Sequence, residues 1–215
     1  MGNSSEQSNS QSLMKINSIF ESIQGEGRYL GRPALFVRTS GCNRRCPYCD
    51  SRYHEVYVDT SVEDIVQKIK ASGMNTIIWT GGEPLLQYGL IRTVIQETRT
   101  KYHHLETNGD LIHRLEGGNF LTYIAASPKD KEGLSKILQY EKEHITEDID
   151  IKIVTDLEKI NMGLLGHADI LMPLTTRDEL ENNKIQRRVW DYCISHNIRF
   201  SPRAHIDVWG DQRCR

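Results

Sequence analysis

The stretch SVEDIVQKIKASGMNTIIWTGG, residues 61–82, places a helical pattern directly before a strand pattern. Its first part has the apolar spacing of an amphipathic helix, with Ser61 as the N-cap and Gly73 at the C-terminal end. Its second part, NTIIWTGG, is a short apolar run that ends in glycines, as a buried strand does. A helix joined to a buried strand is the repeating unit of an α/β fold.

The same alternation extends in both directions along the chain. We predict strands at ALFVRTSG, HHLETNG, LTYIAASPK, DIDIKIVT, ADILMPLT and IRFSPR. We predict helices at LIRTVIQETRTK, at LSKILQYEKEH, around residues 157–165 and from Asp178 to His196, with Cys193 in the core side of the last one. About six such βα units predict a parallel sheet, either open or partly closed into a barrel.

Composition and charge exclude several classes of protein. The 215 residues carry 27 Lys and Arg against 29 Asp and Glu, a formal net charge of -2. This balance gives no global field for nucleic acid or for an anionic membrane, so we expect neither as a partner. Without a run of about 18 apolar residues or a secretory signal pattern, we expect a cytoplasmic protein. Residues 1–13 hold little that could be buried, so we expect a disordered extension there and a single domain over residues 14–215.

Polar and glycine-rich clusters follow the predicted strands. In parallel sheets of this kind the chemistry lies at the carboxyl ends of the strands. This rule selects residues 40–50, 80–84, 106–109, 127–129 and 172–175.

The first of these clusters contains three cysteines within eight positions: Cys42, Cys46 and Cys49. In a reducing cytoplasm such a group indicates metal binding or catalysis rather than disulfides. A structural zinc site needs four protein ligands, and His54 could complete a Cys3His set. Three thiolates could instead hold three irons of a four-iron cluster and leave the fourth iron open. The intervening residues would supply backbone amides and positive charge to offset the cluster: Asn43, Arg44 and Arg45.

The cysteine spacing, with Tyr48 just before the third cysteine, resembles the cluster motif of the radical S-adenosylmethionine enzymes. TGGEP, residues 80–84, resembles the glycine motif of that superfamily. The resemblance implies a 4Fe-4S cluster and S-adenosylmethionine, which chelates the open iron and is cleaved by one electron to a 5'-deoxyadenosyl radical. Because Gly81 and Gly82 lack side chains, a ligand could approach their backbone closely.

The segment FESIQGEGRYLGRPALFVRTSGCN, residues 20–43, resembles the 7-carboxy-7-deazaguanine synthase family, and ETNG, SPK, MPLTT and RAHIDVWGD extend the resemblance. It implies an abridged, partly open (βα)6 barrel. The implied reaction contracts 6-carboxy-5,6,7,8-tetrahydropterin to 7-carboxy-7-deazaguanine with loss of ammonia, in queuosine-type biosynthesis. Mg2+ and a reductase or flavodoxin-type electron donor are implied as well. An abridged barrel leaves sheet edges that a second subunit could cover, so we expect a homodimer.

Site residues follow from the same resemblance. Arg38 would present a bidentate fork to the pterin carboxylate, while Glu26 and Gln24 suit its amide and amino edge. The implied substrate contacts are Ile23, Gln24, Gly25, Glu26, Arg38, Thr80 and His205. The implied cofactor contacts are Tyr48, Gly81, Gly82, Glu83, Glu106, Ser127, Pro128, Lys129, Met172, Pro173, Leu174 and Thr175. Ser51 stands where many relatives have the threonine that binds Mg2+.

Two other readings of the sequence stay open. A glycyl-radical activase shares the cysteine spacing but usually has Gly-Pro-Gly where this chain has Gly25-Glu26-Gly27. A non-enzymatic zinc module that binds RNA is disfavoured by the near-neutral charge and by the lack of a basic aromatic stripe. The tail RAHIDVWGDQRCR also leaves open whether His205, Trp209 or Arg215 closes the pocket.

Overall fold

The computed structural model describes residues 12–49, 55–115, 120–145, 148–210, 212 and 214. Within these residues one sheet has the strand order β3-β1-β2-β4-β5-β6-β7-β8-β9. The strands are β1 (Leu13–Ile23), β2 (Pro33–Thr39), β3 (Val58–Ser61), β4 (Thr76–Gly81), β5 (Tyr102–Thr107), β6 (Tyr123–Ala126), β7 (Ile149–Thr155), β8 (Ile170–Pro173) and β9 (Arg199–Phe200). The α-helices are α1 (Val62–Ala71), α2 (Tyr88–Glu97), α3 (Lys131–Glu143), α4 (Glu179–His196) and α5 (Ala204–Trp209), and the 3-10 helices are η1 (Pro84–Gln87), η2 (Ile112–Leu115) and η3 (Met162–His167).

Every neighbouring pair from β2 to β9 is parallel, as the βα alternation predicted. β1 is antiparallel to both β2 and β3, so a hairpin and a short edge strand extend the sheet beyond its parallel part. The strand order does not close on itself, because β3 lies at one end and β9 at the other. The fold is therefore the partly open α/β barrel that the sequence predicted.

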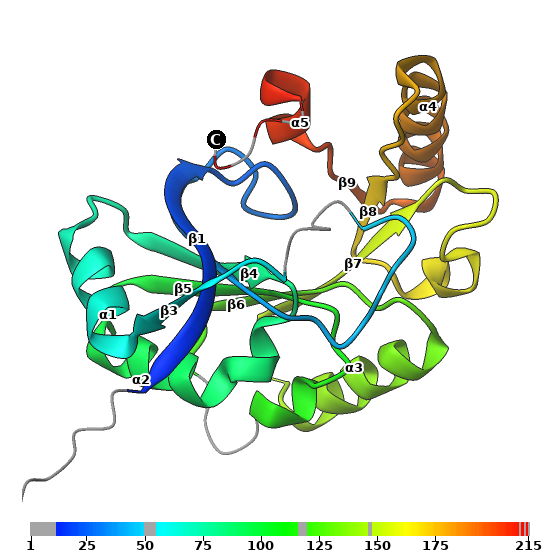
Figure 1. Cartoon of the computed structure of the whole chain (residues 1–215). Coiled ribbons are helices and arrows are strands. Elements are labelled where there is room, and N and C mark those ends of the chain that lie inside the picture. The colour runs from blue at the N-terminus through cyan, green and yellow to red at the C-terminus, as the bar shows by residue number, and fades with distance from the viewer. Residues whose placement is uncertain are drawn as a thin grey trace, which may run out of the picture.

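The two faces of the sheet are covered differently (Figure 1). Helices α1, α2 and α3 lie on one face, whereas the β1–β2 connection and α5 lie over the other. The core forms on the helical side, where fully buried residues such as Trp79, Ile91 and Ile137 pack together. Burying a large apolar side chain of this kind contributes about 1.5–3 kcal/mol. This core fixes the sheet on which the opposite face is built.

Strand alternation places the polar side chains on that opposite face. Trp79, Leu105 and Ile153 belong to the helical core. Because side chains alternate along a strand, their neighbours Thr80, Glu106 and Lys152 point the other way. Arg38 shares this face with Thr80, since the two are side by side in the β2–β4 register.

Helix ends agree with the sequence in two places. The Ser61 side chain accepts a hydrogen bond from the Asp64 backbone N–H, which confirms it as the N-cap of α1. Asp178 caps α4 in the same way, by accepting from the N–H groups of Leu180 and Glu181. Cys193 is 4% exposed on the core side of α4, as predicted.

The helix predicted around residues 157–165 is wrong. The Asp156 carboxylate accepts hydrogen bonds from the backbone N–H groups of Glu158, Lys159 and Ile160, at 3.0, 2.8 and 2.8 Å. A short acidic side chain that bonds the following amides favours a turn over a helix. Leu157 and Asn161 both have φ of 57°, so a helix is restricted to the short 3-10 segment η3.

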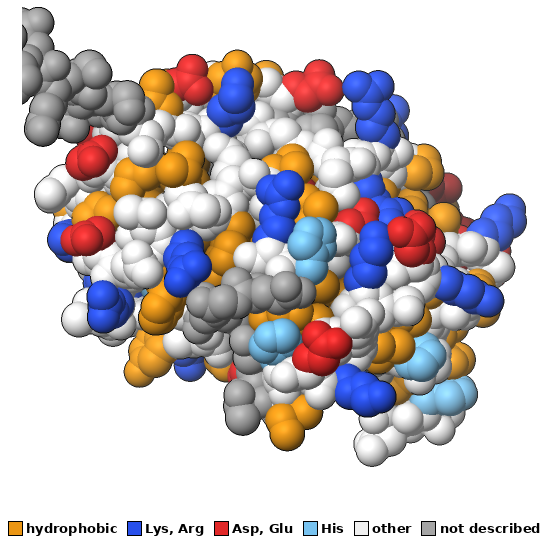
Figure 2. Space-filling model, turned by 90° about the horizontal axis from the view of Figure 1, so that it is seen from below, with side chains coloured by type: hydrophobic (Ala, Val, Ile, Leu, Met, Phe, Trp, Pro, Cys, Tyr) orange, Lys and Arg blue, Asp and Glu red, His pale blue; other side chains and the backbone are white. Residues whose placement is uncertain are grey.

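The helical face carries basic side chains interspersed with acidic and apolar ones (Figure 2). This mixed pattern accompanies the formal net charge of -2. In the part of the chain that the structure describes, no helix is both long enough and apolar enough to span a bilayer.

Candidate active site

The three motif cysteines lie on the loop that leaves β2. Cys42, Cys46 and Cys49 form no disulfides and have intermediate exposure. The Arg44 backbone N–H donates to Cys42 Sγ at 3.4 Å, and the Cys49 N–H donates to the Cys46 carbonyl at 3.2 Å. Burial raises the pKa of the Cys42 thiol, the Arg44 N–H opposes this, and the charges of Glu83, Cys49 and Cys46 raise the pKa further.

This donor set fits an iron–sulfur cluster, because soft thiols on one short loop are the ligands that such clusters use. Among the described residues, no group of three His, Cys, Asp or Glu side chains is close enough to share a single metal ion. A four-iron cluster does not require that closeness, since each thiolate binds its own iron atom. His54, the fourth ligand considered for zinc, lies outside the described residues, as does Ser51.

The side chain of Arg44 anchors the cysteine loop to two neighbouring loops. Its Nη2 is 2.6 Å from Asp110 Oδ1, and its Nη1 is 2.6 Å from Asp130 Oδ2. The positive charge predicted to offset a cluster is therefore paired with aspartates. The Arg45 side chain is 93% exposed and lies 3.9 Å from Glu55. The backbone N–H of Arg44, by contrast, contacts Cys42 Sγ directly.

The glycines after β4 fit against the start of the cysteine loop. A Cβ on Gly81, where φ is +124°, would lie 2.1 Å from the Thr39 carbonyl oxygen. A Cβ on Gly82 would lie 1.9 Å from the Gly41 carbonyl oxygen. The close approach that these glycines allow is thus between two loops of the protein, and it brings the glycine motif against the cysteine motif.

Glu83 joins the same loops from within. It is fully buried, and its carboxylate accepts hydrogen bonds from Leu85 N at 3.0 Å, Thr107 Oγ1 at 2.8 Å and Asn108 N at 2.8 Å. Burial raises the pKa of Glu83. The Glu83 side chain positions the loops after β4 and β5. The cofactor contact predicted for Glu83 therefore stays a prediction, and it would use the main chain.

Tyr48 and Lys129 bring the third cysteine next to the loop after β6. Lys129 Nζ lies 6.0 Å from the centre of the Tyr48 ring and donates to Ser127 Oγ at 3.1 Å. Ser127 Oγ in turn donates to the Lys152 carbonyl at 2.8 Å. Other predicted cofactor residues lie at the ends of neighbouring strands on this edge: Pro128 after β6, Met172 and Pro173 at the end of β8, and Leu174 and Thr175 after it. Met172 is 3% exposed, and the Leu174 N–H donates to the Thr155 carbonyl at 2.9 Å.

A cluster of buried charges occupies the polar face of the sheet. Lys152 Nζ lies 2.9 Å from Glu26 Oε2 and 2.6 Å from Glu106 Oε2. Gln24 Nε2 donates to Glu106 Oε1 at 3.1 Å, and Arg203 Nε donates to Glu26 Oε1 at 3.3 Å. We call these five residues the Lys152 cluster. It unites three predicted site residues with two that the sequence did not single out.

The charges in the cluster act on one another. Burial raises the pKa of Glu26, but the charges of Lys152 and Arg203 more than offset this and leave it well below its usual range. Burial raises the pKa of Glu106 above its usual value although Lys152 opposes it. For Lys152, burial lowers the pKa, but the two carboxylates outweigh burial and raise it. Lys152 is therefore a cation at neutral pH.

The tail reaches this cluster through α5. A Cβ on Gly25 would lie 2.4 Å from His205 Nδ1, and the Ala204 N–H donates to the Gly25 carbonyl at 3.0 Å. His205 Nε2 lies 3.9 Å from Glu26 Oε1. The predicted pair Gly25 and His205 is thus in contact, whereas Ile23, at the end of β1, is 55% exposed. Trp209 ends α5 at 44% exposure, and Arg215 lies outside the described residues.

Arg38 and Thr80 lie on the same face as the cluster, on the neighbouring strands β2 and β4. The Arg38 guanidinium carbon is 5.6 Å from the centre of the Phe20 ring, which stacks on Phe36 with 5.3 Å between ring centres. Aromatic packing of this kind orients a guanidinium without neutralising it.

Lys152 and Arg203 are the residues that sequence reasoning missed. The strand DIDIKIVT carries a signal for the first of them, because its alternation places Asp150 and Lys152 together on one face. A lysine in a strand that is buried on both faces of the sheet needs a carboxylate partner. The sequence does not reveal which carboxylates those are.

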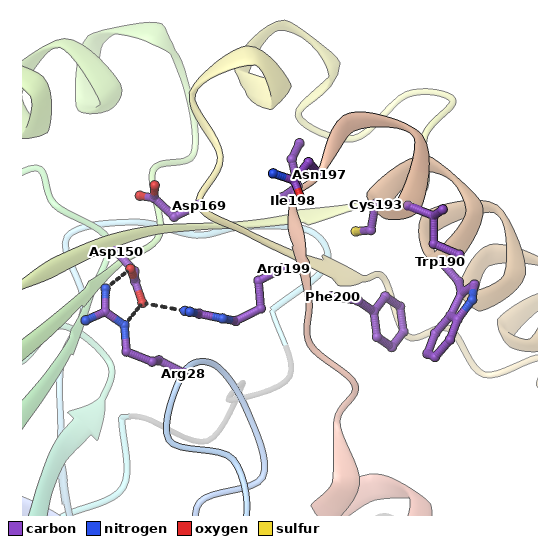
Figure 3. A pocket seen from close by; sticks show the side chains of 10 residues that line it. Arg28, Asp150, Asp169, Trp190, Cys193, Asn197, Ile198, Arg199 and Phe200 are labelled. Atoms are coloured by element: carbon purple, nitrogen blue, oxygen red, sulfur yellow. Dashed lines mark hydrogen bonds and ion pairs between the residues drawn. The ribbon is translucent and has the colours of Figure 1, made fainter.

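A separate cavity of about 650 Å³ lies at the other end of β7 and β8, beside α4 (Figure 3). Arg28 and Arg199 both point at Asp150 on one side of it, and Trp190 and Phe200 form another side. Asp150 Oδ2 also accepts a hydrogen bond from Tyr123 Oη at 2.8 Å. This cavity contains none of the predicted site residues.

Comparisons with known proteins agree with this arrangement. The family model of the Radical SAM superfamily matches residues 36–130. A 7-carboxy-7-deazaguanine synthase of Pyrobaculum aerophilum is 32% identical over 93% of this chain and 96% of its own length. One of Halobacterium salinarum is 32% identical over 92% of this chain and 91% of its own length. The crystal structure of QueE from Escherichia coli shares the fold, with a TM-score of 0.66 and 23% identity over 90% of this chain and 95% of that one. The cysteine loop, the glycine loop and the strand order all agree with these similarities. The chain belongs to the 7-carboxy-7-deazaguanine synthase family of radical SAM enzymes.

Proposed function

We propose that this protein is a carbon–nitrogen lyase that contracts 6-carboxy-5,6,7,8-tetrahydropterin to 7-carboxy-7-deazaguanine with release of ammonia, in queuosine-type biosynthesis. One observation carries the proposal. The cysteine loop packs on the glycine loop, with a 2.8 Å hydrogen bond from the Glu83 N–H to the Gly41 carbonyl, at the edge of a sheet whose polar face holds Gln24, Glu26 and Arg38. A radical source and a polar pocket thus share one side of the fold.

Cys42, Cys46 and Cys49 would hold the 4Fe-4S cluster, which together with S-adenosylmethionine supplies the radical that starts the reaction. Arg38 binds the pterin carboxylate through its planar fork, and Thr80 on the next strand adds a hydroxyl. Glu26 accepts hydrogen bonds from the N–H groups of the pterin ring. Glu106, which the sequence predicted as a cofactor contact, is assigned to the same ring here because Lys152 pairs with both carboxylates. The buried Glu83 carboxylate joins the loops after β4 and β5 and so holds these strands in register. The substrate is thereby fixed relative to the cysteine loop.

Mg2+ and an electron donor complete the proposal. Ser51 supplies one hydroxyl oxygen to Mg2+, a cation that keeps several waters and takes few protein ligands. The electron comes from a reductase or flavodoxin-type protein. The protein donor is not needed for the first test, because a chemical reductant can replace it.

Two copies of the chain form a homodimer in this proposal. β9 ends the sheet, and the neighbouring helix α4 exposes Leu180, Trp190 and Ile194 at 74, 54 and 70%. Apolar side chains of this size beside an open sheet edge favour a protein partner.

The experiment that tests the activity is anaerobic reconstitution with iron and sulfide, followed by incubation with dithionite, S-adenosylmethionine, Mg2+ and 6-carboxytetrahydropterin. We expect 7-carboxy-7-deazaguanine and ammonia in equal amounts, detected by mass spectrometry and an ammonia assay. A reconstituted protein that cleaves S-adenosylmethionine but leaves the carboxypterin unchanged would contradict the proposed substrate.

A further inference from the structure

Lys152 is a deeply buried charge near the proposed substrate site. It lies in the middle of β7, and its side chain is 4% exposed. Its ammonium contacts Glu26 Oε2 at 2.9 Å and Glu106 Oε2 at 2.6 Å. The two carboxylates come from the β1–β2 connection and from β5, which are far from Lys152 in sequence. Lys152 therefore ties three separate parts of the fold together.

Each of these carboxylates is also held by its second oxygen. Glu106 Oε1 accepts from Gln24 Nε2, and Glu26 Oε1 accepts from Arg203 Nε. A carboxylate has about four lone-pair directions, so two contacts leave further acceptor directions on each group. Held at both oxygens, each carboxylate presents those directions in a fixed orientation.

Exposure shows which members of the cluster can reach a ligand. The Glu26 and Glu106 side chains are 17 and 19% exposed, against 4% for Lys152. The carboxylates thus meet the open side of the sheet, and the ammonium lies behind them. This order suits a cation that acts on the carboxylates and does not contact the ligand itself.

We propose that Lys152 is a positioning residue that fixes Glu26 and Glu106 as a pair of ionised acceptors for the amide and amino N–H groups of the pterin ring. This inference rests on the proposed function and adds the residue that sets the geometry of its substrate pocket. Without the ammonium, two buried carboxylates would repel each other, and one of them would take up a proton. A protonated carboxylate offers a donor where the ring needs an acceptor.

The pH dependence follows from the groups around Lys152. Facing it are Glu26 from the β1–β2 connection, Glu106 from β5 and, through Glu26, Arg203 and His205 from the tail. The next titratable groups are Tyr123 on β6 and Asp150 on β7. Tyr123 donates a hydrogen bond to Asp150, and burial together with Asp150 raises the pKa of Tyr123. Since a variant at Lys152 retains all of these, any difference in pH profile between it and the parent protein comes from Lys152. In the variant, the Glu26–Glu106 pair ionises fully only as the pH rises, and its repulsion then grows.

The test measures equilibrium binding of 6-carboxypterin, the fluorescent oxidised form of the proposed substrate, to the reconstituted full-length protein from about pH 5.5 to 7, where the amide of the pterin ring keeps its proton. In Lys152→Met we expect binding to weaken by roughly 10- to 100-fold, the worth of misplaced hydrogen bonds to charged groups, and the loss to change with pH where the parent is flat. Lys184→Met is the matched control, because Lys184 also pairs with a glutamate, at 3.6 Å, but its side chain is 70% exposed. It should bind like the parent at every pH.

The double variant Lys152→Met/Glu106→Gln removes one charge of each sign and keeps the inference testable if the single variant does not fold. We expect it to fold and to bind 6-carboxypterin within roughly 10-fold of the parent, without the pH dependence, because Arg203 still holds Glu26. If the double variant binds 6-carboxypterin as weakly as we expect of Lys152→Met, Lys152 contacts the ligand itself. That result would overturn the positioning role. Parent-like binding and pH profile in Lys152→Met would overturn it too. A parent protein that neither binds nor converts a carboxypterin would instead remove the proposed function on which the inference rests.

Discussion

At the residue scale, the thiols and the acidic groups of the site are held in opposite ways. The three cysteines are partly exposed and form no disulfide, so their sulfurs remain thiols that a cluster could use as ligands. Glu26 and Glu106 are bound on both oxygens by other parts of the chain before any ligand is present. The site therefore combines a partly exposed cysteine loop with a preorganised cluster of polar side chains.

Cysteine replacement separates the metal loop from the core thiol. Cys46→Ala should leave an incomplete cluster and abolish cleavage of S-adenosylmethionine, because each thiolate binds one iron. Cys193→Ala is the control, since Cys193 is buried in α4 away from the loop, and it should change neither property. Iron content and 5'-deoxyadenosine formation are the measurements. Full cleavage activity in Cys46→Ala would exclude the assigned cluster loop.

Arg38→Lys keeps a positive charge but removes the planar fork that can pair with a carboxylate at two points. We expect substrate binding to weaken by roughly 1.5–3 kcal/mol, with the absorption spectrum of the cluster unchanged. Competition binding with carboxypterin gives the affinity. If the variant binds as the parent does, another cation pairs with the substrate carboxylate.

At the scale of elements, the loop after β4 and the loop after β2 behave as one unit, because each glycine of the first lies against backbone of the second. Gly82→Ala places a Cβ 1.9 Å from the Gly41 carbonyl oxygen, which cannot move without displacing Cys42. We expect a lower melting temperature and loss of bound iron. Gly89→Ala in α2 is the control: its Cβ would meet nothing within 4 Å, and it should stabilise the fold by about 0.8–1 kcal/mol. Equal iron retention in both variants would show that the loop contact does not shape the cluster site.

The pairing of β4 with β5 should depend on pH through His103. Trp79 Nε1 donates to His103 Nδ1 at 3.2 Å, so that nitrogen must be unprotonated. Burial lowers the pKa of His103 to about 4. Since the unfolded state gains its proton near pH 6.5, stability is fully present above that pH and is lost as the pH falls toward 4, by an amount on the order of 3 kcal/mol.

Urea unfolding across this pH range measures the effect. His103→Gln can still accept from Trp79 and donate to Thr98, and it should reduce the slope between pH 6.5 and 4. The slope that remains belongs to His104, because burial lowers its pKa to about 4 as well. An unchanged slope in this variant would assign the acid sensitivity to another group.

At the scale of the whole molecule, the sheet ends at β9, a strand of two residues, and the adjoining helix turns apolar side chains outward. We expect the homodimer to use this end of the sheet. Trp190→Glu should shift the protein from dimer to monomer in light scattering, because it buries an unpaired charge in the interface. Leu86→Glu, at an apolar position in η1 that is 38% exposed, is the control and should leave the mass unchanged. A parent protein that is monomeric at high concentration would rule the dimer out.

Local chemistry decided the features that the sequence predicted. The strand positions, the cap at Ser61, the start of α4 near Asp178 and the burial of Cys193 depend on neighbours within a few residues, so periodicity and side-chain type suffice to find them. The helix expected around residues 157–165 failed because one carboxylate, Asp156, bonds three successive amides, and apolar spacing does not report that competition.

By itself, the sequence determined the α/β class, the positions of the parallel strands along the chain and the cysteine and glycine loops, because each is encoded in a continuous stretch. Only the tertiary structure decided that β1 runs antiparallel between β3 and β2, that Gly81 and Gly82 accommodate the cysteine loop, and that Lys152 joins Glu26 to Glu106. The contacts of the glycines and of Lys152 link residues that lie dozens of positions apart. Which carboxylate neutralises a buried lysine depends on how the strands and loops pack, and no local pattern in the chain specifies that packing.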